Sequence, residues 1–215
     1  MKFIVILTHG RSGSTVLKNV VSLLPNSCIR GENGGLVLPL GMAAYQALTW
    51  RTRRYADTVH GPWTGYGKIN FPQIRESLRR MFLQEILDAP PDADFVGFKE
   101  IRFFKMSGED LFHWAEGMRF LFPEILFIIN SRKPEDTARS RWFQKNPDAR
   151  AQLEQCREKF INLHRQLEAG GFQSLLLDHD QWSKDYNLLK QIYLLADAWP
   201  DESEFLKTCE MRLKH

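Results

Sequence analysis

The sequence of 215 residues is poor in cysteine and has no long uninterrupted apolar run. Its three cysteines, Cys28, Cys156 and Cys209, show neither CxxC nor CxxH spacing. The absence of both spacings argues against a structural zinc site, and the small number of cysteines argues against a disulfide framework. Both observations favour a reducing, cytoplasmic setting. The longest apolar stretch, residues 120–129, is interrupted by Pro123 and is far too short to span a bilayer. We therefore expect no membrane span.

The chain also lacks a strong excess of charge of either sign. It carries 29 Lys and Arg against 26 Asp and Glu, a net charge of +3, which is too mild to predict a nucleic-acid partner. Hydrophobic residues at 43% and charged residues at 26% are ordinary globular values and argue against disorder. Because no repeat, low-complexity segment or linker divides the sequence, we expect one domain over residues 1–215.

Apolar runs alternate with segments of helical spacing along the chain. Strands are predicted at residues 2–8, 95–99, 125–129 and 172–177, and helices at residues 15–24, 73–87, 110–118, 135–144 and 149–169. This alternation is typical of an α/β fold, in which helices flank both faces of a parallel sheet. Ligands of such folds bind at the carboxyl ends of the strands, so the residues that follow each strand are the first candidates for a site.

The turn after the first predicted strand combines glycines, hydroxyls and a cation. Its residues are Gly10, Arg11, Ser12, Gly13, Ser14 and Thr15. The glycines allow a sharp turn, and the next helix directs its N-terminus at the same place, so the turn predicts an anion site. No GK[ST] follows, so the Walker lysine of ATPases and kinases is missing. The alternative is a plain connection in which Ser14 or Thr15 caps the helix.

A second basic and hydroxyl-bearing stretch follows the strand predicted at residues 125–129. Arg132 leaves the end of that strand, Pro134 suits the first turn of the next helix, and Ser140 lies eight residues after the arginine. A guanidinium and a hydroxyl one to two helical turns apart could clamp a phosphate. The alternative is a helix start with a solvated basic face.

The two stretches together resemble the sulfotransferases that use 3′-phosphoadenosine-5′-phosphosulfate (PAPS). In that family a strand, a loop of the form R/K-S-G-T/S-T and a helix bind the 5′-phosphosulfate, and a later Arg and Ser bind the 3′-phosphate. Residues 11–15 are similar to the first motif, and Arg132 with Ser140 to the second. Residues 175–182 resemble the strand end that often follows, with His179 and Asp180 where Tyr and Glu are usual. The resemblance implies a P-loop NTPase-like sulfotransferase fold with Arg11, Ser12, Gly13, Ser14, Thr15, Arg132 and Ser140 as cofactor-binding residues.

Two further residues gain a role from the resemblance. Glu32, in the glycine-rich residues 29–35, is similar to the catalytic glutamate of tyrosylprotein and several bacterial sulfotransferases. Lys99 looks like the family's lysine at the scissile sulfate bridge. The resemblance implies Glu32 as general base, Lys99 as the group that stabilises the bridging oxygen, and Arg11 as a neutralising cation. From the residues alone, the alternatives are a solvated glutamate and a lysine paired with Glu100.

The implied activity is metal-independent transfer of a sulfuryl group from PAPS to a hydroxyl or amine. Carbohydrates, phenols, peptide tyrosines and lipids are all acceptors on this fold, and the fold does not select among them. One alternative is a nucleotide-dependent phosphotransferase, for which the Walker lysine is missing. Another is a non-catalytic module that binds an adenine nucleotide. A nucleic-acid binder is motivated by the basic residues 51–80, but this stretch has no RRM, KH or zinc motif.

Within residues 51–80, the segment 60–68 is rich in glycine and aromatic residues. Trp63 or Tyr66 could stack on the acceptor or on adenine, or could anchor a basic connection to the core. His9 and His60 are the next candidates for the base if Glu32 is not. Basic residues that could complete the nucleotide site near the C-terminus, or be surface charge, are Lys207, Arg212 and Lys214.

Overall fold

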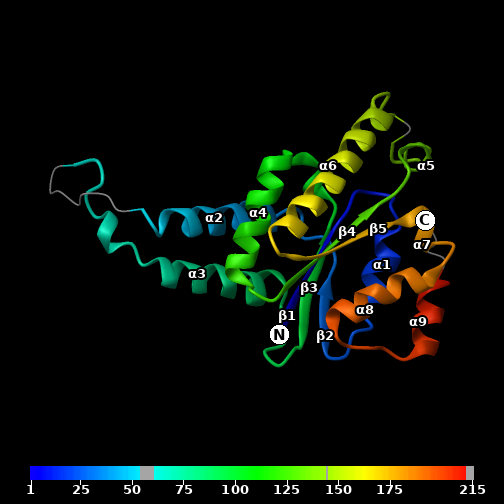
Figure 1. Cartoon of the computed structure of the whole chain (residues 1–215), viewed down its shortest axis with the longest axis horizontal. Helices are drawn as coiled ribbons and strands as arrows, with labels where there is room; N and C mark the ends of the chain where they lie inside the picture. Colours follow the sequence, from blue (N-terminus) through cyan, green and yellow to red (C-terminus); the bar gives the residue numbers. More distant parts are fainter. Residues whose placement is uncertain (54–60, 144, 212–215) are drawn as a thin grey trace.

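The computed structural model describes residues 1–53, 61–143 and 145–211. Its centre is a five-stranded sheet in the order β2-β3-β1-β4-β5 (Figure 1). The strands are β1 (Lys2–Leu7), β2 (Ser27–Arg30), β3 (Phe95–Glu100), β4 (Ile125–Ser131) and β5 (Gln173–Asp178). All neighbouring strands are parallel, so their carboxyl ends share one edge of the sheet.

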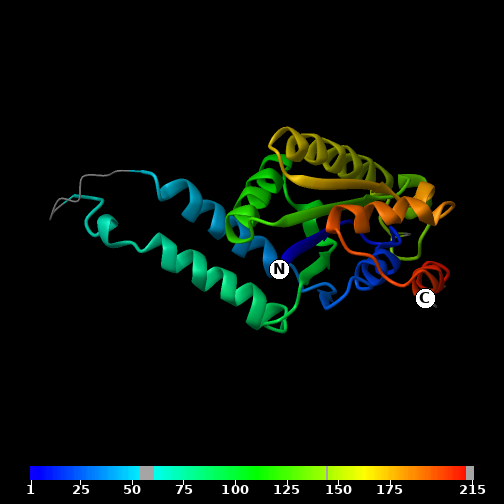
Figure 2. The same cartoon turned by 60° about the horizontal axis from the view of Figure 1, so that its bottom comes forward.

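Helices cover both faces of the sheet (Figure 2). The helices on one face are α2 (Val37–Trp50), α4 (Gly108–Leu121) and α6 (Ala149–Ala169), and those on the other are α1 (Ser14–Val21), α8 (Gln191–Ala196) and α9 (Glu202–Cys209). Because side chains alternate along a strand, Phe3 and Val5 pack with the first group, and Ile4 and Ile6 with the second. The predicted α/β fold, a parallel sheet flanked by helices, is confirmed.

Further helical elements join these segments of the chain. They are η1 (Tyr66–Lys68), α3 (Phe71–Arg80), η2 (Met81–Ile86), η3 (Arg102–Lys105), α5 (Pro134–Ala138), α7 (His179–Trp182) and η4 (Tyr186–Lys190). None of the helices in the described ranges is both long and apolar enough to cross a membrane.

The edge strand β2 is absent from the prediction, which gave four strands. It has four residues, begins with a serine and ends with an arginine, and it pairs with β3 on one side only. So short a strand with polar ends carries little of the apolar alternation by which strands are recognised. Its presence matters for the site, because Glu32 then lies two residues beyond the carboxyl end of a strand.

The helix predicted at residues 135–144 is wrong in its length. Helix α5 ends at Ala138, and the chain continues in successive turns, in which the Ser140 N–H donates to the Thr137 carbonyl and the Phe143 N–H to the Ser140 carbonyl. Trp142 lies against Gly10, a packing contact that local spacing does not encode. Ser140 therefore lies just past α5 rather than one to two turns into it.

Helices α2 and α3 lie side by side in an arm that projects from the sheet, and α1 lies on the opposite side of the molecule (Figures 1 and 2). At the outer end of this arm, the rings of Trp63 and Tyr66 lie 5.7 and 6.2 Å from that of Trp50. The two aromatic rings therefore pack against the end of α2. His60, the second reserve base, lies outside the described residues, as do Arg212 and Lys214.

Candidate functional site

The loop between β1 and α1 has the backbone expected of an anion site. Arg11 and Gly13 both adopt left-handed conformations, with φ of 65° and 76°. A side chain at Gly13 would also place its Cβ 2.2 Å from Cδ2 of His179, so glycine is required there. Gly13 caps α1 without a side-chain hydrogen bond, so the alternative in which Ser14 or Thr15 is the N-cap is wrong.

Three N–H groups at the start of α1 are open to a ligand. Those of Gly13, Ser14 and Thr15 are paired with no acceptor in the described part of the chain. The Arg11 guanidinium likewise makes no ion pair with the described residues. Free N–H donors, the positive end of the helix dipole and a cation together favour a phosphate or sulfate group at this loop.

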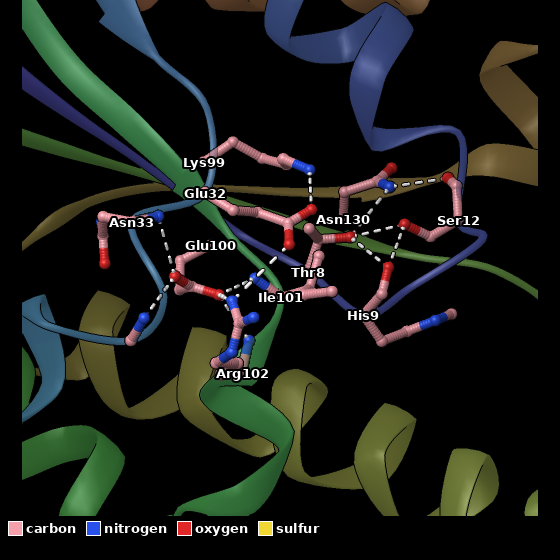
Figure 3. Close-up of polar contacts among 11 residues, drawn as sticks. Thr8, His9, Ser12, Glu32, Asn33, Lys99, Glu100, Ile101, Arg102 and Asn130 are labelled. Carbon is pink, nitrogen blue, oxygen red and sulfur yellow. Dashed lines mark hydrogen bonds and ion pairs between the residues drawn. The ribbon is translucent and has the colours of Figure 1, made fainter. Parts of the chain in front are cut away.

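A buried hydrogen-bond network holds the β1–α1 loop against the end of β4 (Figure 3). The hydroxyls of Thr8 and Ser12 lie 2.6 Å apart, and Ser12 Oγ donates to the His9 carbonyl at 2.8 Å. Asn130 Nδ2 donates to the Ser12 carbonyl at 2.9 Å, and Asn130 Oδ1 accepts from Trp182 Nε1 at 2.9 Å. Sequence reasoning missed Asn130. Its signal was an amide within the buried apolar strand β4.

The predicted pair Arg132 and Ser140 leaves polar groups without partners. Arg132 Nη1 donates to the Arg11 carbonyl at 3.1 Å, which joins the end of β4 to the loop. Its Nε and the Ser140 Oγ are buried and have no hydrogen-bond partner in the described chain. Because a buried polar group without a partner costs free energy, these two groups suit an anionic ligand that would satisfy them.

Residues 178–180 lie next to Arg132 and Lys133. Burial, and then the charge of Arg132, lower the pKa of His179, so its imidazole is neutral at pH 7. Asp180 Oδ2 accepts from the Lys133 N–H at 2.7 Å and so fixes the start of α5. Residues 178–180 therefore border the Arg132 end of the candidate site.

Glu32 and Lys99, predicted from different parts of the chain, form an ion pair (Figure 3). Lys99 Nζ donates to Glu32 Oε1 at 2.5 Å, and the side chains are 9% and 34% exposed for the lysine and the glutamate. Arg102 Nη1 lies 3.6 Å from the other oxygen of Glu32. The alternative pairing of Lys99 with Glu100 is not observed, because Glu100 pairs with Arg102.

Glu100 holds the Glu32 loop against the end of β3. Its fully buried carboxylate accepts hydrogen bonds from five donors: the N–H groups of Asn33, Gly35, Ile101 and Arg102, and Arg102 Nη1. Burial alone would raise the pKa of Glu100, but the hydrogen bonds from Arg102, Gly35 and Ile101 outweigh it and lower the pKa below its ordinary value. Glu100 therefore remains a carboxylate and orients both Glu32 and Arg102.

The substitution Glu100→Gln is expected to lower the free energy of unfolding by about 1–3 kcal/mol at pH 7, because its amide places N–H donors against donors. A lowered folded-state pKa contributes stability above the unfolded-state pKa, and this contribution disappears as the pH falls through the folded-state pKa. The difference from wild type should therefore shrink in acid. Urea unfolding at neutral and acidic pH checks this, with the exposed Glu85→Gln as control; equal stability at pH 7 would contradict it.

Among the described residues, no three His, Cys, Asp or Glu side chains gather in a way that could hold a metal ion. His113 stacks on Tyr45 with ring centroids 4.2 Å apart, and His164 Nδ1 lies 3.0 Å from Ser174 Oγ. Both histidines are packing residues.

Solved sulfotransferases share this fold. The sulfotransferase domain of the Synechococcus PCC 7002 olefin synthase superposes with a TM-score of 0.57 at 14% identity, over 97% of this chain and 77% of that one. A sulfotransferase from Alicyclobacillus acidocaldarius gives 0.50 at 12% identity, over 100% and 87%. One from Mycobacterium tuberculosis gives 0.50 at 10% identity, over 97% and 71%. At these identities the likeness establishes the fold.

Comparisons of sequence are less informative. No protein-family model matches the chain. Two curated proteins match part of it: the small ribosomal subunit protein uS2 of Wolinella succinogenes and that of Helicobacter hepaticus, each 27% identical over 88 residues, or 38% of this chain. The matches span about a third of those proteins, 32% and 33% of their lengths. Matches this short and distant do not assign the chain to a family.

Proposed function

We propose that this protein transfers a sulfuryl group from PAPS to a hydroxyl or amine acceptor. The observation that carries the proposal is the pair of buried groups without partners, Arg132 Nε and Ser140 Oγ, next to a loop with open N–H donors. PAPS has a 3′-phosphate for the pair and a 5′-phosphosulfate for the loop. The fold shared with sulfotransferases and the missing Walker lysine also support this donor over ATP.

In the proposed reaction, the acceptor oxygen attacks sulfur in line with the bond to the 5′-phosphate oxygen, and that bond breaks. Glu32 takes the acceptor proton. Lys99 stabilises the bridging oxygen as negative charge moves onto the leaving 5′-phosphate, and Arg11 with the N–H groups of residues 13–15 stabilises the phosphosulfate oxygens. Lys99 holds the Glu32 carboxylate in the ligand-free chain, so donor binding would turn the ammonium to the bridge and free the base.

Adenosine 3′,5′-bisphosphate, the product nucleotide, is expected to bind about ten- to a hundredfold more tightly than ADP. Only the former has a 3′-phosphate, and one buried charge-assisted contact of about 1.5–3 kcal/mol accounts for this ratio. Isothermal titration calorimetry of both nucleotides measures it. Arg132→Ala should remove most of the preference, and the exposed Arg141→Ala, a matched control near the same turn, should keep it. Equal affinity of wild type for both nucleotides would refute the assignment of PAPS.

Two further ligands belong in the same titration. Tight binding of ATP with Mg²⁺ would instead favour the phosphotransferase alternative. Salt-sensitive binding of a short oligonucleotide would favour a nucleic-acid binder, to which residues 51–80 contribute basic charge.

A further inference from the structure

A small apolar cavity lies beside the β1–α1 loop and is not used by the proposed donor site. Its volume is about 90 Å³. Its lining includes Ile101, Phe104, Trp142, Phe143, Leu153 and His9. The lining comes from four segments: the loop that would hold the phosphosulfate, the segment that follows Lys99, the turns that follow Ser140, and helix α6.

His9 carries a buried polar atom in this wall that lacks a partner. The other polar side chain of the lining, Gln152, is exposed, and its Oε1 accepts from Asn146 Nδ2 at 3.0 Å. Its Nδ1 lies 3.0 Å from the Gly10 carbonyl. A carbonyl oxygen can only accept, so Nδ1 carries the proton and Nε2 carries the lone pair of the neutral imidazole. Nε2 is buried and has no hydrogen-bond partner in the described chain, and His9 is 2% exposed. Figure 3 shows its ring pointing away from the pair of Glu32 and Lys99.

The cavity suits an uncharged ligand. Burial lowers the pKa of His9 and raises the pKa of Cys156, which also lines the cavity, to about 12. Both side chains are therefore neutral at pH 7, and no charged side chain belongs to the described lining. An enclosed cavity that holds benzene has about 150 Å³. A six-membered ring would therefore enter this smaller cavity part-way, with its outer edge against Trp142, which is 61% exposed.

We infer that this cavity binds an aromatic ring that carries one hydrogen-bond donor, with the donor directed at Nε2 of His9. The inference rests on the proposed function in one respect, because we take the ring to be part of the sulfate acceptor. The cavity lies between the donor loop and the segment after Lys99, and this position supports an acceptor. Because His9 faces away from Glu32, the donor group that binds His9 holds the acceptor in place and is not the hydroxyl that reacts.

Phenol and toluene test the cavity without requiring turnover. They share a ring, and only phenol has a donor. Ligand-observed NMR titration should show that phenol binds about three- to tenfold more tightly than toluene, the ratio that one hydrogen bond between neutral groups provides. His9→Phe should abolish this difference. Because His9 is buried in the loop, the exposed Trp142→Ala is a second variant, and it should weaken both ligands. Trp199→Ala, at a residue 55% exposed, is the matched control and should change neither.

Repeating the phenol titration with saturating adenosine 3′,5′-bisphosphate shows whether the cavity binds the acceptor ring or the adenine of the nucleotide. Unchanged phenol affinity in its presence is expected, because the nucleotide and the ring have separate sites. Competition between them would overturn the inference and assign the cavity to adenine. An absence of phenol binding, or phenol binding that Trp142→Ala leaves unchanged, would also overturn it. If phenol binds as described and the bisphosphate does not bind at all, the cavity stands as a ligand site and the proposed sulfotransferase function fails.

Discussion

Replacing Glu32 with glutamine is expected to lower turnover by about 10²–10⁴-fold, the usual contribution of a general base. Glutamine keeps the size of the side chain and one carbonyl acceptor for Lys99, but it cannot take a proton from the acceptor. The affinity for adenosine 3′,5′-bisphosphate should change little, because in the proposed reaction Glu32 faces the acceptor. Loss of turnover with unchanged nucleotide affinity would locate the defect in the chemical step.

The measurement starts with a labelled-sulfate screen of sugars, phenols and peptides, which supplies an acceptor. Steady-state kinetics and nucleotide calorimetry are then compared for wild type, Glu32→Gln and Glu85→Gln. Glu85 is an exposed carboxylate of η2, so its variant controls for loss of a charge. Turnover near wild type in Glu32→Gln would mean that Glu32 is not the base. His60 would then be the next candidate, since His9 is turned away from the pair of Glu32 and Lys99.

The β1–α1 loop was predictable because its chemistry is local. The φ of 65° at Arg11 and 76° at Gly13 belongs to a tight strand-to-helix turn, which short glycine and serine motifs encode. Strand β1 was predictable for the same reason, because its β-branched run is a local signal for a strand. Glu32 and Lys99, by contrast, are 67 positions apart and meet only because β2 pairs with β3. The roles that we propose for them were inferred from the resemblance to a family.

The supporting residues were the harder part to predict. Glu100 and Asn130 are polar residues at the ends of buried strands. They hold the site together through hydrogen bonds to residues that are distant in sequence and that only the fold brings close. The early end of α5 was missed for a similar reason, since Trp142 packs against Gly10 across the loop. Local spacing reports which face of an element is apolar, but it does not report a contact that tertiary packing creates.

Replacing Lys99 with alanine is expected to lower turnover by about 10²–10³-fold, as loss of one preorganised donor to a developing negative charge does. It should also weaken PAPS more than the bisphosphate, which lacks the bridging oxygen to sulfur. Kinetics and competition binding with both nucleotides measure these effects. The exposed Lys184→Ala is the matched control and should behave as wild type. Equal weakening of both nucleotides would place Lys99 at the phosphates instead of at the bridge.

The double variant Glu32→Gln/Lys99→Ala separates catalysis from a structural ion pair. Because the two side chains touch at 2.5 Å, the effects of single substitutions are not independent, and a double-mutant cycle is the appropriate comparison. If the pair only holds the Glu32 loop to β3, Glu32→Gln leaves the Lys99 charge without its carboxylate, and the lysine variant leaves Glu32 with Arg102 alone. The double variant removes both charges of the pair and should then recover turnover. If each residue performs its own step, the double variant should be at least as slow as the slower single variant, whatever its stability. Turnover of the double variant, measured beside its urea unfolding curve, decides between them, and recovered turnover would contradict both catalytic assignments.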